Sequence, residues 1–232
     1  MTRTFIAATV LCALLGNVST AQERIKQDID WTTVREAFEA YCRLPSADNA
    51  NTVLAALPDN SSYREGDFEQ FAAAFRYIHD GRPFRVLGKL VRKGDRLALR
   101  IAFKTMHVSV GGPYDEKWCD LIGRAIRVNP ILFLEEFKMS GLERAWLDLI
   151  SGGYGSADEG YRELSSKEIL LRIKALKTVD RSDLSELRDA GITILNSRLE
   201  YRSEREILLH GNYDFSTGVS VFKIPEGLGG LG

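Results

Sequence analysis

Apolar residues recur at intervals of three and four along most of this chain, which is the spacing of one face of an α-helix. Polar capping residues such as Asp30 and Asn129, and prolines suited to a first turn such as Pro83, separate the apolar runs. A capping-box pattern, Ser165 to Glu168, precedes a further apolar run. Together these signals predict helices that start near residues 31, 46, 67, 83, 97, 115, 130, 142, 165 and 182.

One segment, residues 97–110, has two interpretations. Leu97, Leu99, Ile101 and Phe103 alternate with other residues, which is typical of a strand. The same residues also fit a helical stripe, and every neighbouring segment is predicted to be helical. We therefore predict a helix there and keep the strand as the alternative.

Taken in pairs, the predicted helices begin near residues 31, 67, 97, 130 and 167, at intervals of 36, 30, 33 and 37 residues. Such a quasi-period is typical of stacked helical hairpins, each of which buries its apolar face against a neighbour. In this respect the chain resembles HEAT-type and tetratricopeptide-type repeats, although it carries no tetratricopeptide or ankyrin signature. The resemblance implies an architecture and transfers no functional residue. We predict an all-α fold of about ten helices in stacked antiparallel pairs, α-solenoid-like, with a compact helical bundle as the alternative.

The N-terminus has the organisation of a secretory signal. Arg3 provides a positive start, residues 5–15 are free of charge, and Ser19-Thr20-Ala21 offers small residues for a peptidase. The apolar run is too short to anchor the chain across a bilayer. Lipoprotein processing at Cys12 is the rival, but Leu11 stands where a small residue would be needed. We predict cleavage after Ala21 and export to the periplasm or the extracellular space.

The rest of the chain is divided into an α-helical domain, residues 22–203, and a weakly structured C-terminal tail, residues 204–232. The full sequence has 31 Lys and Arg against 32 Asp and Glu, a net charge of −1, and loss of Arg3 makes it −2. A near-neutral chain has no overall field that draws it to nucleic acid or anionic membranes. No later apolar run is long enough to span a membrane. We expect no nucleic-acid partner and no membrane span after signal cleavage.

The sequence offers few groups for chemistry. Of the three histidines, His79 is predicted to be a cation at a helix C-terminus, His107 a surface or boundary residue, and His210 part of the tail. None has metal-ligand spacing to another histidine or cysteine. The glycine-rich stretch 152–159 lacks the lysine of a phosphate loop, and a flexible connection explains it best.

Two further pairs of residues are candidates for catalysis, two glutamates and two cysteines. The neighbouring Glu135 and Glu136 point about a hundred degrees apart on a helix, so they suit the helix dipole better than acid–base work. Cys42 and Cys119 lie on apolar stripes, and we predict two unbridged, mostly buried thiols. We assign no catalytic, cofactor-binding or metal-binding residue and expect no cofactor.

Three functions remain open. The leading one is a binding or scaffolding module for a protein or peptide partner, because solenoids present long curved surfaces. The second is a small helical enzyme, perhaps hydrolytic, and the third is a structural component of the cell envelope. A deep pocket holding a histidine beside a carboxylate would favour the enzyme, and a shallow face with scattered polar and aromatic side chains the binding module. We also expect Trp118 and Trp146 to be buried.

The signal hypothesis predicts the N-terminus of the exported protein. Protein recovered from the periplasm or culture medium should begin at Gln22, because Ala21 presents the small side chain that the peptidase requires. Intact-mass spectrometry of that protein checks this directly. A protein that retains Met1, or one acylated at Cys12, would contradict the prediction.

Overall fold

The structure is a computed structural model that describes residues 29–59, 68–109, 115–152 and 164–210. All regular structure in these ranges is helical, which confirms the all-α fold. The elements are α1 (Trp31–Arg43), α2 (Ala47–Ala56), α3 (Phe68–Asp80), α4 (Arg82–Val91), α5 (Arg96–Ser109), α6 (Asp115–Gly123), α7 (Ala125–Val128), α8 (Pro130–Ser140), α9 (Arg144–Gly152), α10 (Ser166–Lys177), the short 3-10 helix η3 (Ser182–Leu184) and α11 (Ser185–His210).

Side-chain caps fix several helix starts where the sequence predicts them. Asp30 accepts hydrogen bonds from the backbone amides of Thr32 and Thr33, at 3.0 and 3.3 Å. Asn129 accepts from the amide of Leu132 at 3.0 Å. These bonds satisfy amides that have no partner within the helix, so the chain starts a helix at each cap.

The capping box at Ser165 is formed only in part. The Ser165 hydroxyl accepts from the Glu168 amide at 3.1 Å, as predicted. The Glu168 carboxylate accepts instead from Arg127 of α7 at 2.7 Å and from Arg172 at 3.3 Å. Glu168 therefore connects α10 to α7 through Arg127.

The predicted boundaries hold with two differences. The described part of the ambiguous segment, residues 97–109, is helical and belongs to α5. The segment predicted as one helix from residue 115 is interrupted at Arg124, between α6 and α7. The last helix continues past residue 203 to His210, so the first residues of the predicted tail are helical. The predicted signal, residues 1–21, and the remaining tail, residues 211–232, lie outside the described residues.

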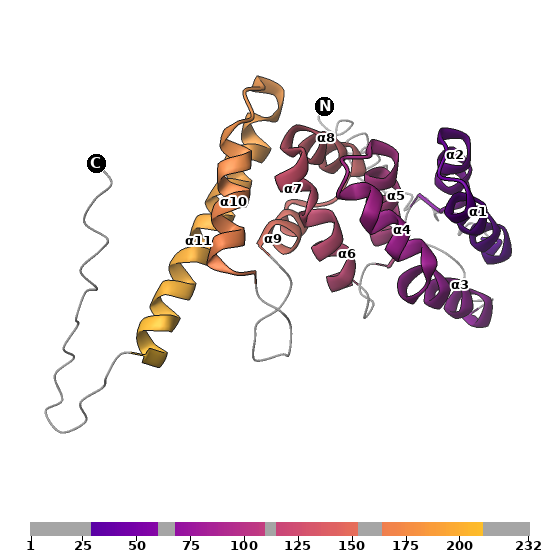
Figure 1. The fold of residues 1–232 in the computed structure, drawn as a ribbon, viewed down its shortest axis with the longest axis horizontal. Coiled ribbons are helices and arrows are strands. Elements are labelled where there is room, and N and C mark those ends of the chain that lie inside the picture. The colour runs from indigo at the N-terminus through magenta and orange to yellow at the C-terminus, as the bar shows by residue number, and fades with distance from the viewer. Residues whose placement is uncertain (1–28, 60–67, 110–114, 153–163, 211–232) are drawn as a thin grey trace, which may run out of the picture.

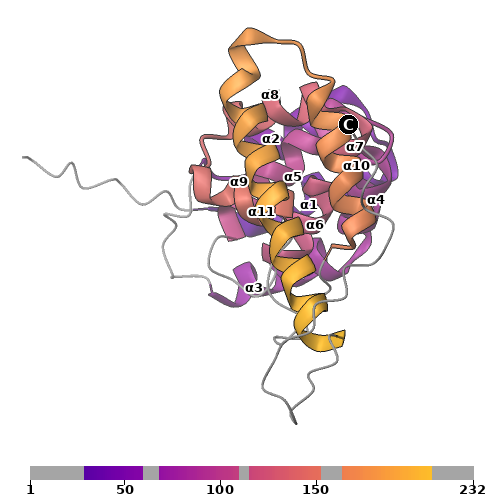
Figure 2. The same ribbon diagram turned by 90° about the vertical axis from the view of Figure 1, so that its left-hand side faces the viewer.

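The helices pack in pairs, and the pairs are stacked from α1 and α2 at one end to α10 and α11 at the other (Figures 1 and 2). Helices α2, α5 and α8 lie side by side and form what we call the first row. Side-chain contacts show that α5 and α8 run parallel and that the C-terminal parts of α5 and α2 lie together. Lys104, late in α5, reaches the Leu54 carbonyl late in α2, whereas Arg96 at the start of α5 pairs with Glu135 in the middle of α8 and Arg100 with Glu136 one residue further on.

A second row contains α4, α6, α9 and α11. One glycine of this row, Gly123 of α6, permits close packing, because a Cβ there would collide with the Ile150 carbonyl of α9 at 2.3 Å. A Cβ on Gly88 of α4 would make only an ordinary contact with Leu121 of α6, at 3.6 Å. Helix pairs stacked one on the next are what helical hairpins produce, so the arrangement is compatible with a helical-repeat fold.

One contact departs from an open solenoid. In such a solenoid each pair touches only the next pair, but α2 of the first pair packs directly on α5 of the third. Lys104 of α5 anchors this contact through the Leu54 carbonyl, at 2.8 Å. None of the helices in the described ranges has both the length and the apolar character that a membrane span needs.

The two tryptophans differ in burial. Trp118 is fully buried, with its ring 5.2 Å from that of Phe84, as predicted. The prediction for Trp146 was wrong, because the apolar side chains of α9 that are fully buried are Leu147 and Ile150, and Trp146 packs half-buried at the edge of the core. Neighbouring residues on a helix point about 100° apart, so a buried stripe through Leu147 and Ile150 leaves Trp146 at its edge.

Because Trp118 is more deeply buried than Trp146, we expect the two alanine substitutions to lower the free energy of unfolding by different amounts. Trp118→Ala should destabilise the protein by ~3–5 kcal/mol, because it leaves a large cavity in the core. Trp146→Ala should cost less than half as much, because its ring already meets solvent. Urea unfolding of both variants measures the two values, and equal costs would contradict the burial described here.

Candidate functional site

The candidate site is a surface cleft of about 360 Å³ in the first row, between α2, α5 and α8. Its volume lies at the lower end of the range typical of ligand sites. Each helix of the row contributes to the walls. The lining residues are Leu54, Asp59, Arg100, Phe103, Lys104, His107, Glu136, Met139 and Ser140.

A row of cations on α5 borders this cleft. Arg96, Arg100 and Lys104 are spaced by four, so they lie along one face of the helix. Each of them bonds to a neighbouring helix. Arg96 and Arg100 bind α8, and Lys104 binds α2. The positions of these side chains are therefore fixed before any ligand binds.

The central acceptor of this row is Glu136, whose side chain is 1% exposed. Arg100 donates to its two oxygens at 2.8 and 2.9 Å, and Arg96 donates at 3.0 Å. A carboxylate is buried at tolerable cost only when such partners neutralise it. The hydrogen bonds that Arg100 donates to Glu136 raise the pKa of the guanidinium, which keeps it charged.

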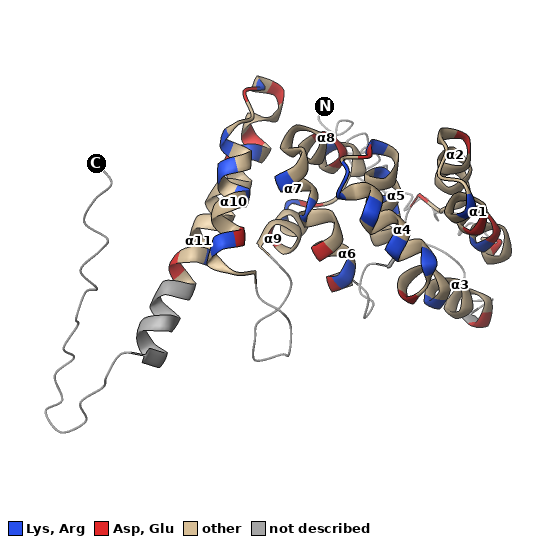
Figure 3. Cartoon of the chain, in the orientation of Figure 1, with Lys and Arg blue, Asp and Glu red and all other residues tan. Residues whose placement is uncertain are grey.

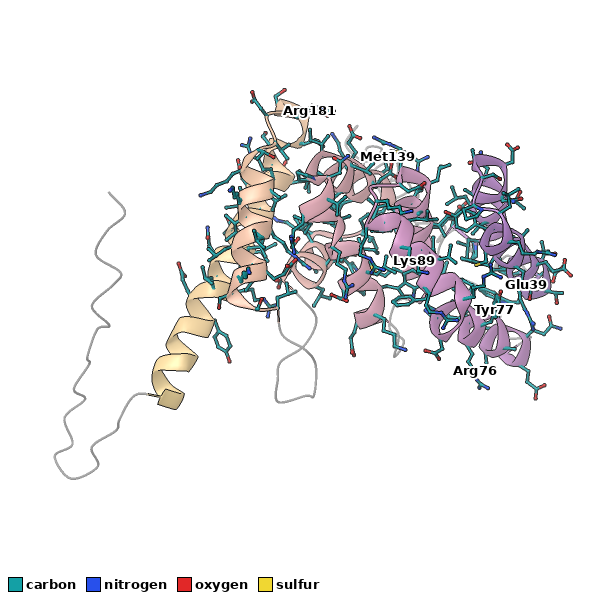
Figure 4. The ribbon with its side chains drawn as sticks, viewed as in Figure 1. Glu39, Arg76, Tyr77, Lys89, Met139 and Arg181 are labelled. Atoms are coloured by element: carbon teal, nitrogen blue, oxygen red, sulfur yellow. The ribbon has the colours of Figure 1, made fainter. Side chains whose placement is uncertain are left out.

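The ion pairs continue along the row beyond the cleft. Glu135 accepts from Arg96 at 2.5 Å and from Arg181 at 2.7 Å, and these bonds lower its pKa. Arg181 also donates to Asp183 of η3 at 2.7 Å. Met139 and Arg181 are labelled along the same edge of the molecule in Figure 4. The prediction that Glu135 and Glu136 mainly complement the α8 dipole is corrected, because both carboxylates join α8 to other elements.

Lys104 closes the α2 side of the cleft. Its ammonium donates to the Leu54 carbonyl at 2.8 Å and to the Asp59 carboxylate at 2.7 Å. The Leu54 carbonyl belongs to the last turn of α2, where carbonyls have no amide donor within the helix, so the cation suits that position. The hydrogen bond from Lys104 lowers the pKa of Asp59.

The base of the cleft is apolar. Phe103 is buried, and its ring lies 6.1 Å from Phe133 and 6.2 Å from Phe137 of α8. Met139 stands at the rim with 64% of its surface exposed, and its sulfur lies 3.8 Å from the Arg100 guanidinium. An apolar base with fixed polar groups around it can receive one apolar side chain and bond to polar groups next to it.

The arrangement offers little for acid–base chemistry. The two carboxylates that line the cleft, Asp59 and Glu136, are each already engaged in an ion pair with a cation of α5. His107 lines the cleft as a half-buried boundary residue, as predicted. Among the described residues, no three His, Cys, Asp or Glu side chains lie close enough to hold a metal ion.

The structure corrects the prediction for His79. Its side chain is 1% exposed, and its Nδ1 accepts a hydrogen bond from the Trp118 indole. Burial lowers the pKa of His79 to about 3, an effect that Asp80 opposes and Lys117 strengthens. His79 is therefore a neutral core residue rather than a cation at the end of α3. The side chain of His210 is outside the described part.

The cysteine prediction is confirmed. Cys42 and Cys119 are both free and buried. Burial raises the pKa of the Cys42 thiol, which makes it a poor nucleophile at neutral pH. Cys119 packs in the core, with its sulfur 3.8 Å from that of Met106. Of the glycine-rich stretch 152–159, the structure describes only Gly152, at the end of α9.

The neutral His79 predicts a pH dependence of stability. Between its ordinary pKa of 6.5 and the folded value of about 3, the unfolded chain binds a proton that the folded chain does not. The buried, neutral His79 therefore contributes fully to the free energy of unfolding above pH 6.5. This contribution is lost as the pH falls, by about 2 kcal/mol between pH 7.5 and pH 5.

The matched variant is His79→Gln, which keeps an acceptor for Trp118 but does not titrate. Its loss of stability between pH 7.5 and pH 5, measured by urea unfolding, should be smaller than that of the unmodified protein by this amount. An identical pH dependence in the two proteins would show that His79 is protonated in the folded state.

Comparison of the chain with protein-family models, curated proteins and solved structures finds no match in any of the three. No residue of the cleft therefore inherits a role from a relative. The function must be argued from the cleft itself, from the fixed cations of α5, the apolar base at Phe103 and the exposed Met139.

Proposed function

We propose that this protein is an exported helical-repeat module, of the HEAT or tetratricopeptide kind, that binds a peptide segment of a protein partner in the first-row cleft. The stacking of helix pairs along the chain and the sequence interval of about 30–37 residues support the repeat assignment. The signal pattern in residues 1–21 supports export.

The observation that carries the proposal is the combination of fixed polar groups with an exposed apolar residue in one cleft. Arg100 and Lys104 are already held by Glu136 and Asp59, so little side-chain entropy is lost when they bond to a ligand. Met139 is flexible and polarisable, and such a residue adapts to the side chain of a partner.

A peptide fits this site better than a small reacting molecule. The cleft is open along the row, and its polar groups lie at the edge around a small apolar base. An extended peptide places one side chain on Phe103 while its carbonyl groups accept from Arg100 or Lys104. The carboxylates are held by cations, so they do not supply the free base that a hydrolytic reaction requires.

The test compares two substitutions of the same kind. Met139→Glu places a charge at the cleft, and Leu170→Glu places one on α10, where Leu170 is similarly exposed, at 53% against 64%. Affinity capture is carried out from the periplasmic extract and culture supernatant of the producing cells. A partner found in this way is then measured by calorimetry with a synthetic peptide taken from its sequence.

The unmodified protein and Leu170→Glu should recover the same partner, and Met139→Glu should bind it about tenfold more weakly, as expected for a change at a central contact. Equal binding by all three proteins would place the site elsewhere. Failure of the unmodified protein to recover any reproducible partner would oppose the binding function itself.

A further inference from the structure

Helix α4 carries a concentration of positive charge that the cleft does not use. Residues 81–104 contain eight Lys and Arg and one acidic residue, Asp95, although the whole chain has a net charge of −1. Within α4 itself there is no Asp or Glu, and the Lys and Arg positions are seen along its ribbon in Figure 3. The excess of charge is therefore local.

Four exposed cations form one face of this helix and the turn after it. We call Arg85, Lys89, Arg92 and Lys93 the α4 basic face. Their spacings of four, three and one residues keep them within about 100° of arc on the helix, opposite the buried Leu87 and Val91. The face is about 12 Å long at 1.5 Å per residue.

In the part of the chain that the structure describes, none of these four cations forms an ion pair with a carboxylate. Arg82, next to them, donates to the Cys42 carbonyl at 3.0 Å, and Arg96 binds α8. The nearest acidic residues in sequence are engaged elsewhere. Asp80 accepts from Lys117 at 2.6 Å, and Asp95 accepts from the Ala98 amide at 2.8 Å.

This arrangement carries an energetic cost in the free protein. Like charges three or four residues apart on a helix repel, and the face contains such pairs between Arg85 and Lys89 and between Lys89 and both Arg92 and Lys93. An anionic partner would relieve the repulsion. The guanidinium groups of Arg85 and Arg92 also match carboxylates in a two-bond geometry.

We propose that the α4 basic face binds an acidic segment, rich in Asp and Glu, of a protein partner. An anionic membrane fits less well, because the apolar side chains of α4 point into the core and are not free to insert. Single-stranded nucleic acid fits less well too, because the one aromatic residue of α4, Phe84, packs against Trp118. The face is separate from the cleft, so this proposal does not depend on the proposed function.

The test uses two triple variants with the same change of charge. One is Arg85→Gln, Lys89→Gln and Arg92→Gln on α4, and the control is Lys167→Gln, Lys174→Gln and Lys177→Gln on α10, where the three lysines are also exposed. The probe is a fluorescein-labelled oligoglutamate peptide, and its binding is followed by fluorescence anisotropy at low and physiological salt.

We expect the α4 triple variant to bind the peptide about tenfold more weakly and the α10 control to stay within about twofold of the unmodified protein. The thermal midpoint of the α4 variant should be unchanged or higher, since like-charge repulsion is removed. If that variant is less stable, Lys89→Gln alone, at the centre of the face, is measured in the same way and should still weaken binding.

Three results would overturn the proposal. An equal loss in the two triple variants would mean that only net charge matters. Tighter binding of phosphatidylglycerol vesicles than of the peptide would assign the face to a membrane, and tighter binding of oligothymidine would assign it to nucleic acid.

Discussion

The structure of the first row depends on the buried carboxylate of Glu136. A charged group with 1% of its side chain exposed is stable only if its partners stay in place, and Arg96 and Arg100 supply three hydrogen bonds to it. Because the partners are on α5 and the carboxylate on α8, the pairing fixes the register of the two helices. The same contact brings Phe103 over Phe133 and Phe137, so the base of the cleft follows from it.

A second buried charge joins two helices in the same way, at the C-terminal end of α9. Arg172 of α10 is 1% exposed and donates to the carbonyls of Ile150 and Ser151, at 3.1 and 2.8 Å. These carbonyls lie in the last turn of α9, where no amide of the helix can reach them. Gly123 leaves the necessary space, since a Cβ there would come within 2.7 Å of the Arg172 guanidinium. Each buried charge thus ties one stacked pair to the next.

The sequence was sufficient for features that are determined within a few residues. The helices, and the caps at Asp30 and Asn129, depend on local spacing and local hydrogen bonds, and they were predicted correctly. The environment of His79 could not be predicted in this way, because the indole that it binds is 39 residues away on α6. Glu136 was misjudged for the same reason, since its arginines lie 36 and 40 residues before it.

The cleft could not be predicted from sequence at all, because it is lined by three helices whose register is set only by packing. Trp146 shows a different kind of limit, since it lies one residue from the fully buried Leu147 and an inferred stripe cannot resolve a rotation of that size. Pairing the helices by period did suggest which of them would be neighbours, but not that α2 would lie against α5.

That contact between α2 and α5 bears on the order in which the protein folds as it is made. A chain of hairpins that touch only their neighbours can assemble from the N-terminus as each hairpin emerges. Here Lys104 follows Leu54 by 50 residues, so the surface that covers α2 does not exist until α5 has been synthesised. Until then the apolar side of α2 stays uncovered. The long loop between α2 and α5 also slows the docking of the two helices. The N-terminal end of the stack is therefore expected to be the part of the fold that is completed late, although it is synthesised first.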